Sequence, residues 1–186
     1  MIETQGTYCE SLANHYRHAW RTPGERREWN RGPRGDLPPG FGVFRFARSP
    51  AMWACGTVCM SEEQDEARIE LHLLSPVATD DHVELLTAVA HYHRTGSRLG
   101  VGHTVNFGRP WLPGSQCSHG LVSLPYLDGP DLEILRLDGK VVRFLWLIPI
   151  TKAEVEYKKK HGLEALEAKL EEAGFAYLDP QRASVV

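Results

Sequence analysis

The chain has 186 residues, 42% of them hydrophobic, and a formal net charge of −3. This length and composition can bury a sizeable core and exclude a disordered protein. No apolar run approaches the roughly 20 residues of a membrane helix, and the slightly acidic balance argues against a nucleic-acid partner. Residues 1–16 lack the basic-then-apolar pattern of a secretory signal. We therefore expect one domain spanning residues 1–186, in the cytoplasm and not at a membrane.

The four cysteines are widely spaced and form no C-x-x-C pair. They stand at Cys9, Cys55, Cys59 and Cys117. This spacing predicts ordinary thiols in a reducing compartment. Cys55 and Cys59 lie four residues apart on a predicted strand, too far from each other for a favourable disulfide between the two.

The first predicted element is a helix over residues 8–20, because Leu12 and Tyr16 follow helical spacing. Residues 21–40 differ in composition and contain four Pro, four Gly and five Arg. Such a composition interrupts regular structure and predicts a long surface loop. Whether the Arg-rich part, residues 21–34, is ordered is left open by the sequence.

The middle of the chain predicts three strands and a helix. The strands are expected over residues 43–48, 52–60 and 68–74, the last two joined as a hairpin by an acidic turn. A helix follows over residues 79–94, with Thr79 as its N-cap.

Four more strands are predicted after that helix, over residues 103–107, 118–125, 132–137 and 141–148. Asp138-Gly139 is typical of a tight hairpin between the last two. The strand 141–148 is apolar on both faces, which predicts a central position covered on both sides.

A T-x-x-E capping box, Thr151 with Glu154, begins a helix that Gly162 separates from a second helix over residues 163–173. The elements do not alternate regularly between strand and helix. The order therefore predicts an α+β fold: a mixed, mostly antiparallel sheet of about six strands with helices packed on it.

Several segments occur in a characteristic order. They are RIELHLLSP at 68–76, HVELLTAVAHYH at 82–93, GVGHTVNFG at 100–108, VSLPYL at 122–127, VRFLWLIPITKAEVEYKKKHGLEALEAKL at 142–170, and an ending with Asp179, Arg182 and Ser184. Together they resemble the Suppressor-of-fused domain family in its stand-alone bacterial form. The resemblance is clearest over residues 41–186 and does not reach the Arg-rich loop.

The resemblance implies a protein-binding role without catalysis and without a cofactor. The animal protein that names the family binds and restrains a transcription factor of the Hedgehog pathway. Bacterial members are proposed to be immunity proteins that neutralise a toxin encoded nearby. We therefore expect another protein as the partner, and a toxin encoded nearby is one candidate. The sequence leaves the identity of the partner and the oligomeric state of this chain open.

Two Arg- and Trp-containing turns are candidates for the contact surface, because both residue types are enriched at interface hot spots. The candidates are Arg26, Arg27, Trp29, Arg31, Arg109 and Trp111. An acidic partner, or the acidic run 62–66 of a second copy, would suit the Arg-rich loop. The alternatives are a solvated loop and a core position for Trp111.

His103 follows two glycines and precedes a strand, so it is a candidate polar site or a structural histidine that fixes the loop. An alternative function, a small hydrolase or metal-dependent enzyme, would need His72, His103, Cys117 and His119 to converge. A third possibility is a structural subunit of a larger complex. No motif assigns a catalytic residue, a metal ligand or a cofactor.

Overall fold

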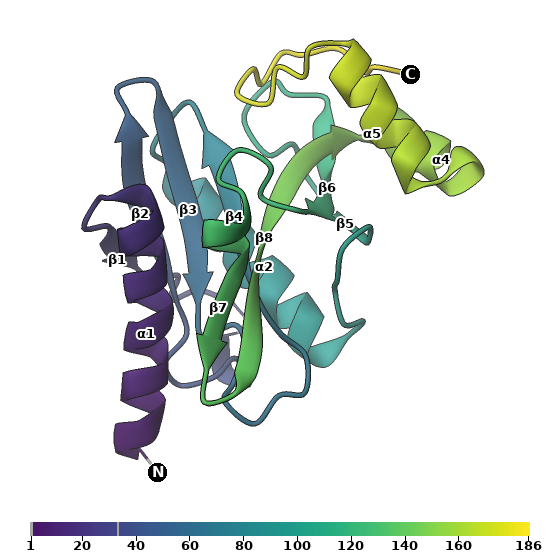
Figure 1. The fold of residues 1–186 in the computed structure, drawn as a ribbon. Coiled ribbons are helices and arrows are strands. Elements are labelled where there is room, and N and C mark those ends of the chain that lie inside the picture. The colour runs from purple at the N-terminus through teal and green to yellow at the C-terminus, as the bar shows by residue number, and fades with distance from the viewer. Residues whose placement is uncertain (1, 33) are drawn as a thin grey trace.

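The computed structural model describes residues 2–32 and 34–186, which form a mixed sheet with helices on both faces (Figure 1). The strands are β1 (Glu25–Arg27), β2 (Gly42–Ser49), β3 (Met52–Val58), β4 (Arg68–Ser75), β5 (Thr104–Asn106), β6 (Cys117–Ser123), β7 (Ile134–Leu137) and β8 (Lys140–Thr151). The helices are α1 (Ile2–Trp20), the 3-10 turn η1 (Arg34–Asp36), α2 (Asp80–Thr95), α3 (Pro130–Glu133), α4 (Lys152–His161) and α5 (Leu163–Glu172). Among the described helices, none has the length and apolar character to cross a bilayer.

The sheet has eight strands in the order β1-β2-β3-β4-β8-β6-β5, with β7 paired to β8 outside this path. Its pairs are antiparallel except for β4 and β8, which run parallel at the centre. This confirms the predicted α+β class and its mostly antiparallel sheet. β1 lies inside the segment that was predicted to be a loop, and it extends the sheet beyond the expected strands.

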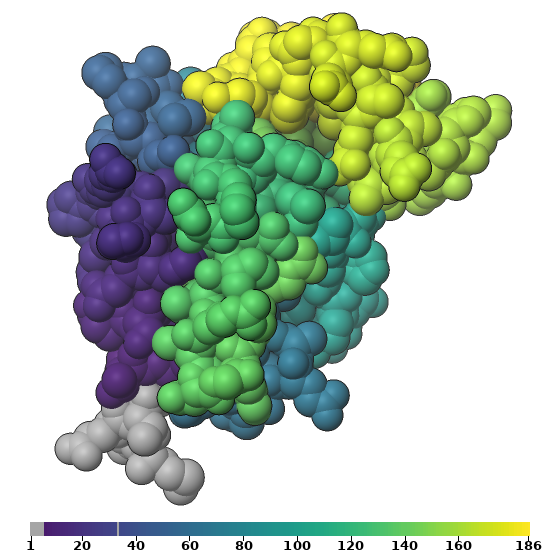
Figure 2. Space-filling view, viewed as in Figure 1, coloured from purple at the N-terminus to yellow at the C-terminus, as the bar shows by residue number. Residues whose placement is uncertain are grey.

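The two faces of the sheet carry separate cores. Leu12 and Tyr16 of α1 pack with Phe144 of β8 on one face, whereas Leu86 of α2 packs with Leu145 of β8 on the other. Successive side chains of a strand point to opposite faces, so the apolar run of β8 fills both cores. The predicted central, doubly covered strand is confirmed. In Figure 2, α1 (purple) lies beside the green segment that contains β7, and the C-terminal helices (yellow) lie at the top of the molecule.

Two local signals act as predicted. Asp138 and Gly139 have φ values of 48° and 75°, the left-handed conformations that a tight hairpin between β7 and β8 requires. At the start of α4, Thr151 Oγ1 accepts the backbone N–H of Glu154, and a Glu154 carboxylate oxygen accepts the backbone N–H of Thr151. The capping box therefore fixes the turn from β8 into α4.

The C-terminal segment is held by the same glutamate. Arg182 donates from Nη1 to Glu154 Oε1 at 2.6 Å and from Nη2 to Glu154 Oε2 at 2.9 Å. The backbone N–H of Val185 also donates to Glu154, and the hydroxyl of Ser184 lies 3.1 Å from that of Thr151. The Asp-x-x-Arg-x-Ser ending thus binds the final residues to the base of α4.

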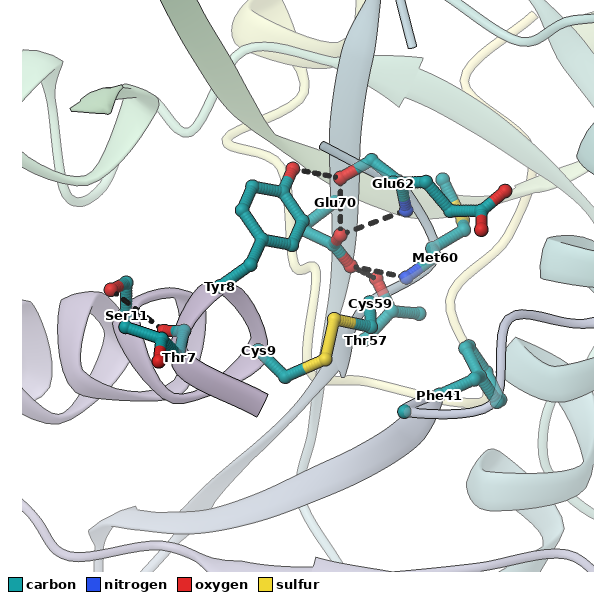
Figure 3. Close-up of a disulfide and its surroundings, with 12 residues drawn as sticks. Thr7, Tyr8, Cys9, Ser11, Phe41, Thr57, Cys59, Met60, Glu62 and Glu70 are labelled. Atoms are coloured by element: carbon teal, nitrogen blue, oxygen red, sulfur yellow. Dashed lines mark hydrogen bonds between the residues drawn. A yellow bond between two sulfur atoms is a disulfide. The ribbon is translucent and has the colours of Figure 1, made fainter. Parts of the chain in front are cut away.

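The structure corrects the prediction for two of the four cysteines. Cys9 of α1 and Cys59 after β3 form a disulfide with Cα atoms 5.4 Å apart (Figure 3), while Cys55 and Cys117 are free and buried. The two partners are separated by 50 residues, and α1 must dock on the sheet before they meet. Spacing in the sequence therefore carries no sign of this pairing.

A buried carboxyl group lies beside the disulfide (Figure 3). Glu70 of β4 is fully buried and accepts hydrogen bonds from the hydroxyl of Thr57, the backbone N–H of Met60, and both the N–H and hydroxyl of Ser61. The Ser61 hydroxyl also lies 2.8 Å from the hydroxyl of Tyr8 on α1. Burial raises the pKa of Glu70 to about 7 in spite of these donors.

Candidate functional site

The Arg-rich segment is joined to the start of α2 through Asp80. Arg27 of β1 donates to both carboxylate oxygens of Asp80 at 3.1 Å, and Arg45 of β2 donates to one of them at 2.5 Å. β1 pairs with β2, which places both arginines near this helix end. The hydrogen bond from Arg45, followed by that from Arg27, outweighs burial and lowers the pKa of Asp80.

The second predicted patch reaches the same helix one turn later. Arg109 Nη2 donates to Glu84 at 2.6 Å. Trp29 and Arg31 lie along a hollow of about 330 Å³ whose opposite wall includes Glu84. The two segments, distant in sequence, therefore border one glutamate of α2. We call the resulting surface the α2 face and define it by Arg27, Trp29, Arg31, Asp80, Glu84 and Arg109.

A second hollow of about 300 Å³ lies between α2 and the edge strand β5. Its walls include Glu84, Tyr92 and Arg109, and Tyr92 is 42% exposed. The α2 face is thus a helix surface bordered by two shallow hollows. An exposed tyrosine and a half-buried tryptophan supply the aromatic surface that protein interfaces favour.

The charges of the α2 face are largely neutralised within the chain. Arg27 pairs with Asp80, and Arg109 pairs with Glu84. Arg26 lies on the other side of the sheet, beside α1, where it donates to Glu28 at 3.1 Å and to the carbonyl oxygens of Gly40 and Phe41. Arg31 is exposed and forms no ion pair with a described residue. The α2 face is therefore mixed in charge.

Two of the four acidic side chains in the run 62–66 are paired within the chain. Glu62 and Asp65 both accept hydrogen bonds from the guanidinium group of Arg94 at the end of α2. These carboxylates fasten the turn between β3 and β4 to α2. Glu62 and Asp65 are therefore not available to pair with the Arg-rich loop of a second copy.

Trp111 is a core residue. Its side chain is 2% exposed, its ring stacks on His82 with centroids 5.6 Å apart, and its Nε1 donates to the hydroxyl of Ser115 at 3.0 Å. The indole ring therefore packs beneath α2 and offers no surface to a partner. Of the six candidate contact residues, the other five have exposed or half-buried side chains.

His103 is exposed and fastens the turn before β5. Its Nδ1 lies 3.1 Å from the carbonyl oxygen of Arg98, and its backbone N–H donates to Gly100. Gly102, with a φ of 83°, supplies the left-handed residue that this turn needs. This geometry supports the reading of His103 as a histidine that fixes the loop.

The histidine and cysteine residues of the enzyme alternative lie apart. His72 packs against Trp20 on the α1 side of the sheet, whereas Cys117 belongs to the core on the α2 side. Burial lowers the pKa of His72 to about 4, which favours a neutral ring at physiological pH. Within residues 2–32 and 34–186, no three His, Cys, Asp or Glu side chains are arranged to hold a metal ion.

Three residues of this site were not singled out from the sequence. Asp80, Glu84 and Tyr92 all lie within the helix that was predicted over residues 79–94. Their side chains fall on the side of α2 opposite its buried apolar residues. That pattern marks an exposed face, but it does not show which loops border it.

Comparison with protein families gives a match between residues 41–183 and the model described as Suppressor of fused protein (SUFU). Among curated proteins, Immunity protein YqcF of Bacillus subtilis (strain 168) is 37% identical over 62 residues. That match covers 33% of this chain and 32% of the relative, so it spans about a third of either length.

Among solved structures, a chain described as a Suppressor of fused homologue, from Neisseria gonorrhoeae FA 1090, matches with a TM-score of 0.84 and 33% identity over 97% of both chains. A chain of the Sufu-Fu complex matches with a TM-score of 0.72 and 14% identity over 96% of this chain and 92% of that one. Drosophila Suppressor of Fused gives a TM-score of 0.70 at 14% identity, and the match covers 96% of this chain and 51% of that chain.

Proposed function

Because the chain belongs to the Suppressor of fused family, we propose that it functions by binding another protein and performs no catalytic step. A complex of a structurally similar chain, Sufu with Fu, supports binding as the mode of action. We treat residues 1–186 as one Suppressor-of-fused-like domain. In this proposal β1 and the rest of the Arg-rich segment are part of the binding domain.

The partner in this proposal is a bacterial toxin, and the chain is its immunity protein. The observation that carries this step is the sequence similarity to Immunity protein YqcF. In this proposal the chain neutralises the toxin by covering part of its surface. Shape and charge complementarity then determine specificity, and no bond is made or broken.

The α2 face is the surface that we assign to the toxin. Its salt bridges hold Arg27, Asp80 and Arg109 in fixed positions before a partner arrives, which lowers the entropy lost on binding. Trp29 and Tyr92 supply aromatic contact area beside the hollows. Arg31 is the arginine of this face that remains available for a carboxylate of the toxin.

The compartment in this proposal is the cytoplasm, where an immunity protein would meet a toxin that enters or is made in the same cell. Reducing conditions there would hold Cys9 and Cys59 as thiols for much of the time. Rapid alkylation of thiols in intact cells, followed by mass spectrometry of the peptides that contain Cys9 and Cys59, measures this directly. Full oxidation in growing cells would contradict a cytoplasmic location.

The test of the proposed function is co-expression with the products of genes adjacent to that of this chain. We expect one product to stop growth when expressed alone, and growth to return when this chain is co-expressed and co-purifies with it. Arg109→Glu should weaken both rescue and co-purification. Arg136→Glu, an equal charge change at an exposed residue of β7, is the matched control. Absence of binding and rescue with every adjacent product would overturn the proposal.

A further inference from the structure

A groove of about 660 Å³ lies on the opposite side of the sheet from the α2 face, between α5 and the ends of β6 and β8. Its floor is formed by Leu121, Trp146, Ile148 and Leu170, which belong to the core on the α1 side. Figure 2 shows this side of the molecule, where the C-terminal segment borders the middle of the chain. We call it the α5 groove.

One wall of the α5 groove is aromatic. The ring centroid of Trp146 lies 5.4 Å from that of Tyr177 and 6.1 Å from that of Phe175. Trp146 Nε1 is buried and has no hydrogen-bond partner among the described residues. A buried N–H without an acceptor is unfavourable.

The rim of the groove on α5 is acidic. Glu164, Glu167 and Glu171 follow one another at spacings of three and four residues, so they share one side of the helix. Glu167 accepts hydrogen bonds from Ser123 at 3.1 Å and from Tyr126 at 3.2 Å. Glu164 and Glu171 are exposed and form no ion pair with a described cation.

The opposite rim is apolar and exposed. Tyr126 is 60% exposed and Leu127 is 50% exposed, and both line the groove. An open groove of this size with aromatic walls is typical of sites that take up a side chain or small ligand. Charge on one rim and apolar surface on the other restrict what can fit.

We propose that the α5 groove docks a segment of a partner protein in which an aliphatic or aromatic side chain is flanked by Lys or Arg. The apolar side chain fills the groove between Trp146 and Leu127, and the cations pair with Glu164 and Glu171. This inference rests on the proposed role of the chain in protein binding and adds a surface separate from the α2 face. Charge complementarity selects the occupant: an acidic segment would be repelled by the three carboxylates.

The experiment uses the full chain and a fluorescein-labelled peptide, Gly-Lys-Arg-Leu-Phe-Lys-Arg-Gly, titrated by fluorescence anisotropy. One control peptide replaces Lys and Arg by Glu, and another replaces Leu and Phe by Ser. The variants are Glu171→Lys and, as a matched control, Glu172→Lys. These residues are neighbours in sequence, but Glu171 lines the groove and Glu172 is paired with Lys169.

We expect the basic peptide to bind at micromolar to millimolar concentration and both control peptides to bind more weakly. Glu171→Lys should weaken binding roughly tenfold, and Glu172→Lys less than about threefold. The indole N–H resonance of Trp146, assigned with Trp146→Phe, should shift during an NMR titration. Circular dichroism of each variant confirms that it is folded.

Equal loss of affinity in the two lysine variants, preference for the acidic peptide, or an unchanged Trp146 resonance would overturn the proposal. Peptide-independent dimerisation that buries the groove, detected by sedimentation, would also overturn it in favour of a second copy. Failure of toxin rescue with intact peptide binding would contradict the toxin assignment and leave the groove supported. Intact rescue without peptide binding would contradict the assignment of the groove and leave the toxin assignment supported.

Discussion

Arg182 and Glu154 form a buried, two-pronged ion pair that links the C-terminal segment to the first turn of α4. Arg182 also donates to the carbonyl oxygen of Pro149, so its guanidinium group spans the end of β8 and the start of α4. Burial alone would raise the pKa of Glu154, but the hydrogen bonds and charge of Arg182 outweigh it and hold the pKa below its usual value. The ionised form is therefore the one that stabilises the fold.

Arg182→Ala should lower the free energy of unfolding by about 3 to 5 kcal/mol, because it leaves the Glu154 carboxylate buried without its cation. Urea denaturation measures this. Lys169→Ala is the control: its pair with Glu172 is exposed, and its removal should cost less than about 1 kcal/mol. Because the pKa of Glu154 is lowered, this contribution is present above its unfolded pKa and is lost as pH falls through the folded pKa. Equal effects of the two substitutions would contradict this account.

Reduction of the Cys9–Cys59 disulfide should lower stability by about 4 kcal/mol, the chain-entropy value for a loop of the observed separation. The measurement is urea denaturation of the wild-type protein with and without dithiothreitol. The Cys9→Ser, Cys59→Ser double variant should show the lower stability in both conditions. A wild-type midpoint that does not respond to dithiothreitol would show that the bond contributes little.

Glu70→Gln should alter how stability depends on pH. Since the pKa of Glu70 is raised to about 7, the folded chain retains a proton that the unfolded chain releases near its ordinary pKa of 4.5. Its contribution is therefore fully present below pH 4.5 and declines as pH rises to about 7, by about 3 kcal/mol. The difference in unfolding free energy between wild type and variant, measured across this interval, isolates the effect.

Taking this difference is necessary because buried imidazoles act in the opposite direction. Burial lowers the pKa of His72, His82 and His93 to about 4, so their contribution falls as pH drops from 6.5 towards 4. Glu70→Gln should also be destabilising at low pH, because an amide NH2 group would face the fixed backbone N–H of Met60 or Ser61. A wild-type-minus-variant difference that is independent of pH would contradict the raised pKa.

Substitution of two tryptophans should distinguish a residue of the core from a residue of the binding surface. Trp111→Ala should cost about 3 to 5 kcal/mol, because it empties a buried site beneath α2. Trp29→Ala, at a half-buried position, should cost less stability and weaken toxin binding by a larger factor than Arg136→Ala does. Thermal denaturation and a pull-down with the toxin give the two readouts. A stability loss from Trp29→Ala as large as that from Trp111→Ala would place Trp29 in the core instead.

Local chemistry made much of the fold predictable. The Asp138-Gly139 turn and the Thr151–Glu154 cap are determined within a few residues, and both are present. β1 was not predicted, because Glu25–Arg27 contains no apolar residue and follows Pro23 and Gly24. Its strand conformation comes from pairing with β2, which is not a local property of the sequence.

The candidate site was predicted less completely than the fold. The two Arg-containing turns were identified by composition, but their meeting at Glu84 depends on how α2 lies across the sheet. Similarly, the burial of Trp111 and the pairing of Cys9 with Cys59 are consequences of tertiary packing. Residue type can identify such side chains as candidates for a site. Their exposure and their contacts depend on segments that are distant in the chain.

The parallel pairing of β4 with β8 has a consequence for synthesis of the protein in the cell. Arg68 lies opposite Val142. The edge of β4 that pairs with β8 therefore stays unpaired until most of the chain has been synthesised. Until then the nascent protein exposes unpaired backbone groups and the apolar side chains of β4. Such distant pairing slows folding and invites contact with neighbouring chains. The ribosome-bound first half is therefore the form of this protein with the greatest need of a chaperone.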